Sequence, residues 1–204
     1  MQEDVKQNIT PKKKKERKKE KAPFTKGVIE QLELVVIFFA IIIIVFSFVC
    51  KSCMVDGDSM LNTLHHRERV IIWNLFYTPD YEDIVVIHDT GDLNKPIVKR
   101  VIGLPGDTVY VEHRLDGMTV TVTHSNGVSE VLEEEYINYD IKSGNLSFYA
   151  KSATYEVGEG QVFVMGDNRL DSLDSRIEGC YDSRRILGKV IFRLMPLDRI
   201  GTVK

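Results

Sequence analysis

The chain has 204 residues, a length that fits one ordinary domain plus a small additional element. Its net charge of -3 hides an asymmetry, because the first 26 positions hold ten of the 27 basic residues but four of the 30 acidic ones. The remaining positions carry 17 basic and 26 acidic side chains, so they lack the basic stripe of a nucleic-acid-binding domain.

The N-terminal segment, residues 1–26, is rich in lysine and has no apolar pattern. We predict a solvated, disordered basic tail. Near an anionic inner leaflet each lysine would contribute about 1 kcal/mol of attraction. As a nucleic-acid-binding arm the tail is a weak signal, and we expect no nucleic-acid partner.

An apolar run follows, from Leu34 to Cys50, in which Ser47 is the single polar residue. At 1.5 Å per residue it covers roughly 26 Å, close to the roughly 30 Å core of a bilayer. A cleaved signal peptide has a shorter apolar region, and a core helix rarely lacks polar residues around its whole circumference. We therefore predict a transmembrane helix over residues 27–52.

The charges on either side of the span predict its orientation. Ten Lys and Arg residues precede it, whereas Lys51, Asp56 and Asp58 follow it. The positive-inside rule then places the N-terminus in the cytoplasm and residues 53–204 on the outer side of the membrane.

The rest of the chain reads as short strands rich in β-branched and aromatic residues, bounded by turn residues. Pro105-Gly106 suits a type II turn, and Asp116-Gly117 and Asn126-Gly127 indicate hairpins. No long segment has a helical period. We predict a mostly β, sandwich-like or barrel-like domain of seven or eight strands, with a variable insertion at about 113–160. The predicted strands are 69–77, 83–89, 96–104, 108–114, 118–124, 161–167 and 188–194.

Metal and cofactor chemistry finds no support in the residue pattern. The five histidines have no metal-ligand spacing, and no glycine-rich phosphate loop is present. The three cysteines, Cys50, Cys53 and Cys180, form no disulfide framework and are interpreted as incidental. We expect no metal and no cofactor.

A serine and a lysine remain as candidates. A serine hydroxyl needs a base to remove its proton, and a lysine can be that base only when burial keeps it neutral. Lys99 lies among apolar residues in PIVKRVIGL, and strand alternation would send Arg100 to the opposite face. The alternative is a solvent-facing lysine at a sheet edge, and local sequence alone favours it.

A polar loop, MGDNRLDSLDSR at 165–176, combines three acids, two arginines and two serines. It is either an ordinary loop closed by Asp–Arg pairs or a brace whose hydroxyl orients the lysine amine. Its composition does not distinguish the two.

Four pieces in this order after a single span resemble bacterial type I signal peptidase, a membrane serine protease that cleaves signal peptides. They are GDSMLNTL at 57–64, EDIVVI at 82–87, VKRVIGLPGDTV at 98–109 and GDNRLDSLDSR at 166–176. The resemblance implies a β-rich catalytic domain of coiled antiparallel sheets, as in signal peptidases and LexA-like self-cleaving repressors. It runs from the span to the last predicted strand.

The resemblance also implies roles for individual residues. Ser59 would be the nucleophile and Lys99 the general base of a Ser/Lys dyad, with the Ser59 amide donating to the oxyanion. Some members of the family add a serine hydroxyl two residues before the nucleophile. This chain has Gly57 at that position, as the Gram-positive-like members do. Supporting roles fall to Ser172, which would bond the Lys99 amine, to an Asp174–Arg176 ion pair, and to Asp167 and Arg169.

Substrate recognition is implied in the same way. Val55, Met60, Leu64 and Val98 would line shallow pockets for the small residues, usually alanine, at positions -1 and -3 of a signal peptide. The expected partners are signal peptides of exported preproteins, the lipid bilayer and, as a further candidate, the secretion translocon. The expected location is the bacterial cell membrane.

One position departs from the family pattern, because Asn62 stands where the family has proline. Proline would fix φ and make the turn rigid, so we expect looser positioning of Met60 and Leu64. An alternative function therefore stays open: a weak or inactive membrane-anchored paralogue that binds peptides or partners.

Overall fold

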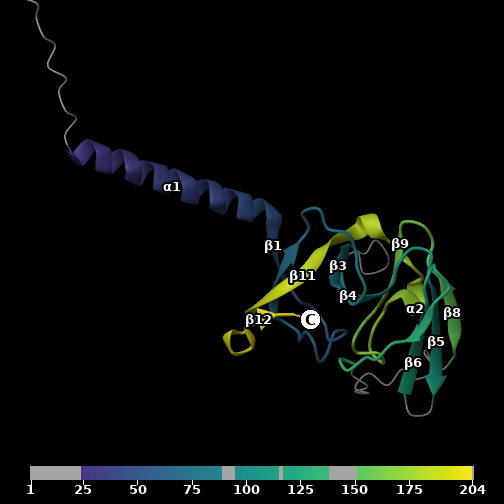
Figure 1. Cartoon of the computed structure of the whole chain (residues 1–204). Coiled ribbons are helices and arrows are strands. Elements are labelled where there is room, and N and C mark those ends of the chain that lie inside the picture. The colour runs from purple at the N-terminus through teal and green to yellow at the C-terminus, as the bar shows by residue number, and fades with distance from the viewer. Residues whose placement is uncertain (1–23, 89–94, 115–116, 138–150, 204) are drawn as a thin grey trace, which may run out of the picture. The chain divides into compact units, whose positions relative to one another are not determined.

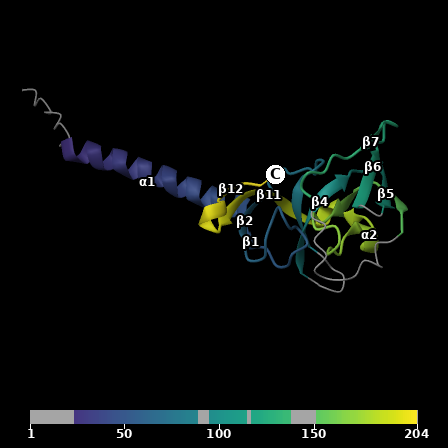
Figure 2. The same cartoon turned by 90° about the horizontal axis from the view of Figure 1, so that it is seen from below.

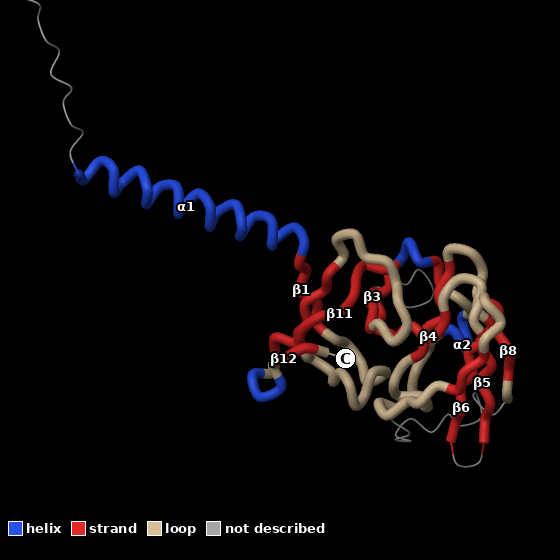
Figure 3. Tube along the Cα trace, viewed as in Figure 1, coloured by secondary structure: helices blue, strands red, loops and turns tan. Residues whose placement is uncertain are grey.

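The computed structural model describes residues 24–88, 95–114, 117–137 and 151–203. The chain divides into two units, residues 1–44 and 45–204. Figure 1 labels the elements and Figure 3 colours them by type. They are α1 Phe24–Val49, β1 Cys50–Met54, β2 Arg69–Trp73, β3 Ile84–His88, β4 Pro96–Gly103, β5 Thr108–Arg114, β6 Gly117–Thr123, β7 Ser129–Val131, β8 Ala153–Glu156, β9 Gln161–Met165, α2 Ser175–Glu178, β10 Tyr181–Asp182, η2 Ser183–Arg185, β11 Ile186–Met195, η3 Leu197–Arg199 and β12 Gly201–Thr202.

Helix α1 contains an apolar stretch, Gly27–Ile44, that is long and apolar enough to cross a membrane. The side chains of this stretch are almost all exposed, as those of a lipid-facing helix would be. The helix begins three residues before the expected start at 27 and ends at Val49 rather than at 52. It ends there because residues 50–54 pair with β2 instead, in an antiparallel ladder. The predicted tail before Phe24 lies outside the described residues.

The larger sheet has eight strands in the order β1-β2-β11-β3-β4-β9-β10, with β12 paired to β11. Every pairing in it is antiparallel, and β11 and β4 carry register shifts that bend the sheet. The prediction of a mostly β fold with coiled antiparallel sheets is confirmed. Strand β4 lies between β3 and β9, so it is an interior strand of this sheet.

A second sheet has four strands in the order β7-β6-β5-β8. Figure 2 shows β5, β6 and β7 gathered at one end of the domain, away from β1 and β12. The connection from β4 is the predicted type II turn, in which Gly106 has φ +88° and the Asp107 amide donates to Leu104 O at 3.0 Å. This turn brings β5 back against β4 and so joins the two sheets.

Some strands were not predicted from the sequence. Strands β7 and β8 fall within the predicted variable insertion at about 113–160, and β1, β10 and β12 are also additional to the prediction. Each has at most five residues, which is too few for its sequence pattern alone to identify a strand. Their pairing is set by neighbouring strands rather than by their own pattern.

Candidate active site

Lys99 lies on the interior strand β4, where Val85 of β3 is its pairing partner. Its side chain is buried, with 3 % of the residue exposed, and Arg100 on the next position is equally buried. The alternative of a solvent-facing lysine at a sheet edge is therefore wrong. Strand β4 has a pairing partner on each edge, and other parts of the domain cover the side chains of both residues.

Ser59 lies in the turn between β1 and β2. The Leu61 amide donates to Asp58 O and the Leu64 amide to Met60 O, so two backbone hydrogen bonds close the turn. Met60 and Leu64 are fully buried and anchor the turn in the core. Lys99 Nζ lies 2.8 Å from Ser59 Oγ, as a donor in this structure, so the two residues predicted to form the dyad are in direct contact.

Burial changes the acidity of the amine. Desolvation lowers the pKa of Lys99 from 10.5 to about 8, although the charge of Asp174 opposes this shift. In the part of the chain that the structure describes, no Asp or Glu side chain lies within ion-pair distance of Lys99 Nζ. At pH 7 about one-tenth of such an amine is neutral, and a neutral amine can accept the proton of a hydroxyl 2.8 Å away.

The Asp174–Arg176 pair stiffens the loop after β9. Arg176 Nε and Nη2 both donate to the Asp174 carboxylate at 2.8 Å. The same carboxylate accepts from the Gly166 amide at 3.0 Å. Burial would raise the pKa of Asp174, but the Arg176 guanidinium outweighs it and holds the pKa below its usual range. The carboxylate thus stays ionised and ties both ends of the loop together.

Ser172 is buried at the inner side of this loop, packed against Gly166. A methyl group added at Gly166 would overlap the Ser172 hydroxyl and would lie 2.5 Å from the carbonyl oxygen of Ser59. Gly166 is therefore the point at which the loop touches the Ser59 turn. Only a residue without Cβ fits this close approach.

Asn168 joins the same two segments and was not predicted from the sequence. Its amide donates to Ser59 O at 3.0 Å, and its side-chain Nδ2 donates to Asp58 O at 3.1 Å. A local pattern could not find it, because the partners are 110 positions apart. Together with Gly166, it fixes the loop against the backbone of the predicted nucleophile.

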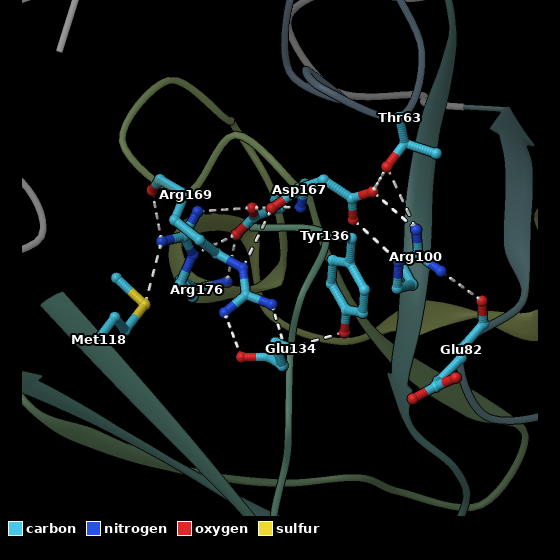
Figure 4. Close-up of polar contacts among 11 residues, drawn as sticks. Thr63, Glu82, Arg100, Met118, Glu134, Tyr136, Asp167, Arg169 and Arg176 are labelled. Atoms are coloured by element: carbon cyan, nitrogen blue, oxygen red, sulfur yellow. Dashed lines mark hydrogen bonds and ion pairs between the residues drawn. The ribbon is translucent and has the colours of Figure 1, made fainter. Parts of the chain in front are cut away.

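Asp167 and Arg100 form a second buried ion pair, shown in Figure 4. Arg100 Nε and Nη2 donate to the two carboxylate oxygens at 2.9 and 2.7 Å. Thr63 of the Ser59 turn also donates to Asp167. The pair thus links β4, the loop and the turn, and neither Arg100 nor Thr63 was among the predicted site residues.

Arg169 is fully buried and pairs with Glu134, a residue of the predicted variable insertion. Its Nε donates to Gly166 O at 3.2 Å, and its own carbonyl accepts from Arg176 Nη1 at 2.7 Å. The guanidinium therefore holds the loop from inside.

The residues predicted to line substrate pockets, Val55, Met60, Leu64 and Val98, meet in one apolar cluster. They are at most 9 % exposed in this structure. Their role in accepting substrate side chains stays a prediction, and it requires the cluster to open toward the substrate.

Gly57, two residues before Ser59, donates its backbone amide to His66 Nδ1 at 3.1 Å. Within the described ranges, no group of His, Cys, Asp or Glu residues could hold a metal ion.

Comparison with known proteins shows similarity over most of the chain. A family model described as signal peptidase, peptidase S26, matches residues 28–195. The chain is 34% identical to signal peptidase I P of Bacillus subtilis subsp. natto, over 87% of this chain and 95% of that protein. It is 30% identical to signal peptidase I of Bacillus amyloliquefaciens, over 91% and 98%.

A solved structure is also similar. It is a signal peptidase I from Enterococcus faecalis V583, 32% identical in sequence, with a TM-score of 0.42. The match covers 57% of this chain and 99% of that one. The extent of the family match and the identity of the relatives decide the assignment: this chain belongs to the signal peptidase family, peptidase S26.

Proposed function

We infer that this chain is a membrane-bound serine endopeptidase that cleaves N-terminal signal peptides from exported preproteins. The carrying observation is the 2.8 Å contact between Lys99 Nζ and Ser59 Oγ, made by an amine that is buried. Signal peptidase I relatives support the same activity. The finer assignment, Ser59 as nucleophile and Lys99 as general base, is the proposal for which we give a mechanism.

The proposed reaction begins with the neutral amine of Lys99. It accepts the Ser59 proton while Oγ attacks the carbonyl carbon of the scissile peptide bond. The negative charge that develops on the carbonyl oxygen is stabilised by the Ser59 amide, and losing one such donor costs about 3 kcal/mol in other enzymes. The Lys99 ammonium then gives its proton to the leaving amine. Water then gives a proton to the same amine as it attacks the acyl-enzyme carbonyl carbon. The ammonium returns this proton to Ser59 Oγ as the ester bond breaks, which releases Ser59 and the neutral amine.

The supporting residues act on the position and charge of this amine. In the proposed mechanism Ser172 hydrogen-bonds Lys99 and aims it at Ser59. The Asp174–Arg176 pair keeps Ser172 and Gly166 in place through its bond to the Gly166 amide. Asp167 fixes the loop through its ion pair with Arg100, and Arg169 fixes it through the bond from its Nε to Gly166 O.

Substrate binding follows from the same site. A signal peptide would lie extended beside the site, with main-chain hydrogen bonds to a strand edge. The small residues at positions -1 and -3, of the Ala-x-Ala type, would occupy pockets formed by the predicted apolar set. A small pocket favours alanine because a larger side chain would overlap the packed residues around it.

The membrane supplies the substrate. Helix α1 anchors the chain, and Ser59 follows the end of the helix by ten residues. We propose that the N-terminus is cytoplasmic and that residues 53–204 lie outside the cell membrane, because the positive charges precede the span. Signal peptides leaving the secretion translocon would then reach Ser59 near the outer surface, where proximity replaces a search through solvent.

The alternative of an inactive peptide-binding paralogue has no support beyond Asn62. The Asn62 carbonyl accepts from Arg199 Nη2 at 3.4 Å and the Thr63 carbonyl from Arg193 Nη2 at 2.8 Å. These bonds hold the backbone of the turn where the family has proline. The loose turn expected from asparagine is therefore countered by two arginines.

The test uses the full chain in detergent and a preprotein with an Ala-x-Ala cleavage site. We expect a single cut at the end of the signal peptide, and the rate should rise with pH along a limb centred near 8, as the amine of Lys99 becomes neutral. Ser59→Ala should abolish the cut. No cleavage by the wild-type chain between pH 6 and 10, or undiminished cleavage by Ser59→Ala, would contradict the proposal.

A further inference from the structure

A short segment of the predicted variable insertion reaches the loop behind the active site. We name residues 132–137, between β7 and the end of the described range, the strap. Its first residue is fixed to the second sheet, because the Leu132 amide donates to Val120 O at 2.9 Å and its side chain packs against the apolar cluster there. Along the strap, burial alternates: Glu133 and Glu135 are exposed, whereas Glu134 and Tyr136 turn inward.

Glu134 neutralises Arg169. Its carboxylate accepts from both terminal nitrogens of the guanidinium, with Nη1 at 2.8 Å, in the two-pronged geometry that suits arginine. The Glu134 side chain is 4 % exposed and that of Arg169 is wholly buried. In the described part of the chain no other carboxylate makes an ion pair with Arg169. A buried guanidinium without its counter-charge would be strongly unfavourable.

Tyr136 contacts the other buried arginine. Its hydroxyl donates to Glu134 Oε1 at 3.0 Å, and the centre of its ring lies 3.8 Å from the guanidinium carbon of Arg100. A cation over an aromatic face at this distance is attracted by the ring. Figure 4 shows Glu134 and Tyr136 side by side, one directed at Arg169 and the other at Arg100.

The two arginines act on either side of one short segment, Gly166–Asn168. Arg100 holds Asp167, and Arg169 Nε donates to Gly166 O. The same segment touches the Ser59 turn through Gly166 and through the Asn168 amide, which donates to Ser59 O. The strap, the two arginines, the segment Gly166–Asn168 and Ser59 are therefore joined by one continuous series of contacts.

We propose that Glu134 and Tyr136 are positioning residues for the peptidase reaction, which set the segment Gly166–Asn168 against the Ser59 turn by fixing Arg169 and Arg100. This inference rests on the proposed function, since it concerns the geometry of the same site. The strap touches neither Ser59 nor Lys99 in the contacts described. Its effect is indirect, and it assigns a role in catalysis to a part of the chain outside the motifs.

The test compares three glutamates on the same strap. Glu134→Gln removes the inward charge, whereas Glu133→Gln and Glu135→Gln remove the same charge from exposed neighbours. We expect Glu134→Gln to lower kcat about 10-fold with KM within twofold, because a slight displacement of a catalytic group slows the reaction while the substrate contacts remain. The two control variants should match the wild type in both constants.

Tyr136 gives a second series. Tyr136→Phe keeps the ring over Arg100 and should retain most of kcat, whereas Tyr136→Leu removes the ring and should lower kcat by about the same factor as Glu134→Gln. All variants are assayed as full chains in detergent at a temperature at which fluorescence of Trp73, the single tryptophan, shows them folded. A variant that loses thermal stability but keeps the wild-type kcat when folded has lost only a structural contact.

This design distinguishes failure of the positioning role from failure of the proposed function. If Glu134→Gln and Glu133→Gln have equal kcat values, the positioning role is overturned while the proposed function stands. If the wild-type chain itself fails to cut the preprotein, the proposed function fails first. A kcat loss for Glu134→Gln and Tyr136→Leu together, with normal controls, supports the strap.

Discussion

Lys99 and Arg100 are neighbours on β4 and are both buried, but the protein treats their charges in opposite ways. Arg100 has a two-pronged partner in Asp167 and an aromatic ring beside it. Lys99 has a hydroxyl, and none of the described carboxylates pairs with it. One strand can therefore carry both a paired structural cation and an amine with a lowered pKa. The paired guanidinium of Arg100 adds structure, whereas the unpaired amine of Lys99 gives up its proton near pH 8.

The largest expected effect on activity comes from replacing Lys99, the buried cation without an ion-pair partner. Lys99→Met keeps the unbranched apolar stem of the side chain and removes the amine, so we expect kcat/KM for preprotein cleavage to fall by about 10³-fold or more. The measurement is cleavage by the full chain at pH 8. Near-normal turnover would show that Lys99 is not the base.

The same variant should be more stable than the wild type at neutral pH. Below about pH 8 the amine of Lys99 is protonated in both the folded and the unfolded state, and burying it costs about 3 kcal/mol. The cost is lost as pH rises from about 8 toward 10.5, because the folded state no longer carries the proton. The advantage of Lys99→Met in urea unfolding should thus shrink between pH 7 and 9.5. A constant difference would contradict the lowered pKa.

Replacing Arg100, the buried cation with an ion-pair partner, should mainly lower the free energy of unfolding. Arg100→Met leaves Asp167 buried without its cation, and breaking a buried pair costs about 3–5 kcal/mol. Urea unfolding followed by Trp73 fluorescence measures the loss. Arg184→Met, which breaks an exposed pair with Asp182, is the matched control and should change the free energy of unfolding far less, because water screens that pair. Equal losses would remove the distinction between buried and exposed pairs.

A smaller effect is expected where the loop after β9 meets the Ser59 turn. Gly166→Ala would push a methyl group against Ser59 O and the Ser172 side chain, so kcat should fall about 100-fold through displacement of the turn. Gly127→Ala is the control: it has φ +83° but open space around it, so it should cost stability without changing kcat. A normal kcat for folded Gly166→Ala would show that the contact does not set the geometry of the turn.

The smallest effect should come from Ser172→Ala. If the hydroxyl only orients the amine, its loss leaves the base in place, and we expect kcat to fall about 10-fold with KM unchanged. Steady-state kinetics with the same preprotein decide this. A loss as large as that of Lys99→Met would mean that Ser172 takes part in proton transfer itself.

Much of the fold could be predicted because its signals are local. An apolar run sets the span, and alternation of β-branched residues sets the longer strands. The turn at Pro105-Gly106 follows from the φ values that proline and glycine prefer. The short strands β7, β8, β10 and β12 were missed, because two to four residues carry too little pattern and form only against a neighbour.

The candidate site divides in the same way. Its motif residues were identified by resemblance, whereas the structure alone gives Lys99 and Arg100 their different partners, Ser59 and Asp167. The contacts of Glu134, Tyr136, Asn168 and Thr63 were not foreseen. Glu134 and Arg169 are 35 positions apart, and Asn168 is 110 from Asp58. A local pattern carries no information on such pairs.

The amino-acid sequence by itself determined the membrane span, the β-rich class and which side chains could do acid–base chemistry, since these depend on composition and short-range order. Only the tertiary structure decided which buried charges are paired. Burial penalises a charge, and the penalty is offset or kept according to which distant side chain the fold brings within hydrogen-bond reach. That choice leaves Arg100 and Arg169 paired with carboxylates and lowers the pKa of the Lys99 amine, as the proposed role of a base requires.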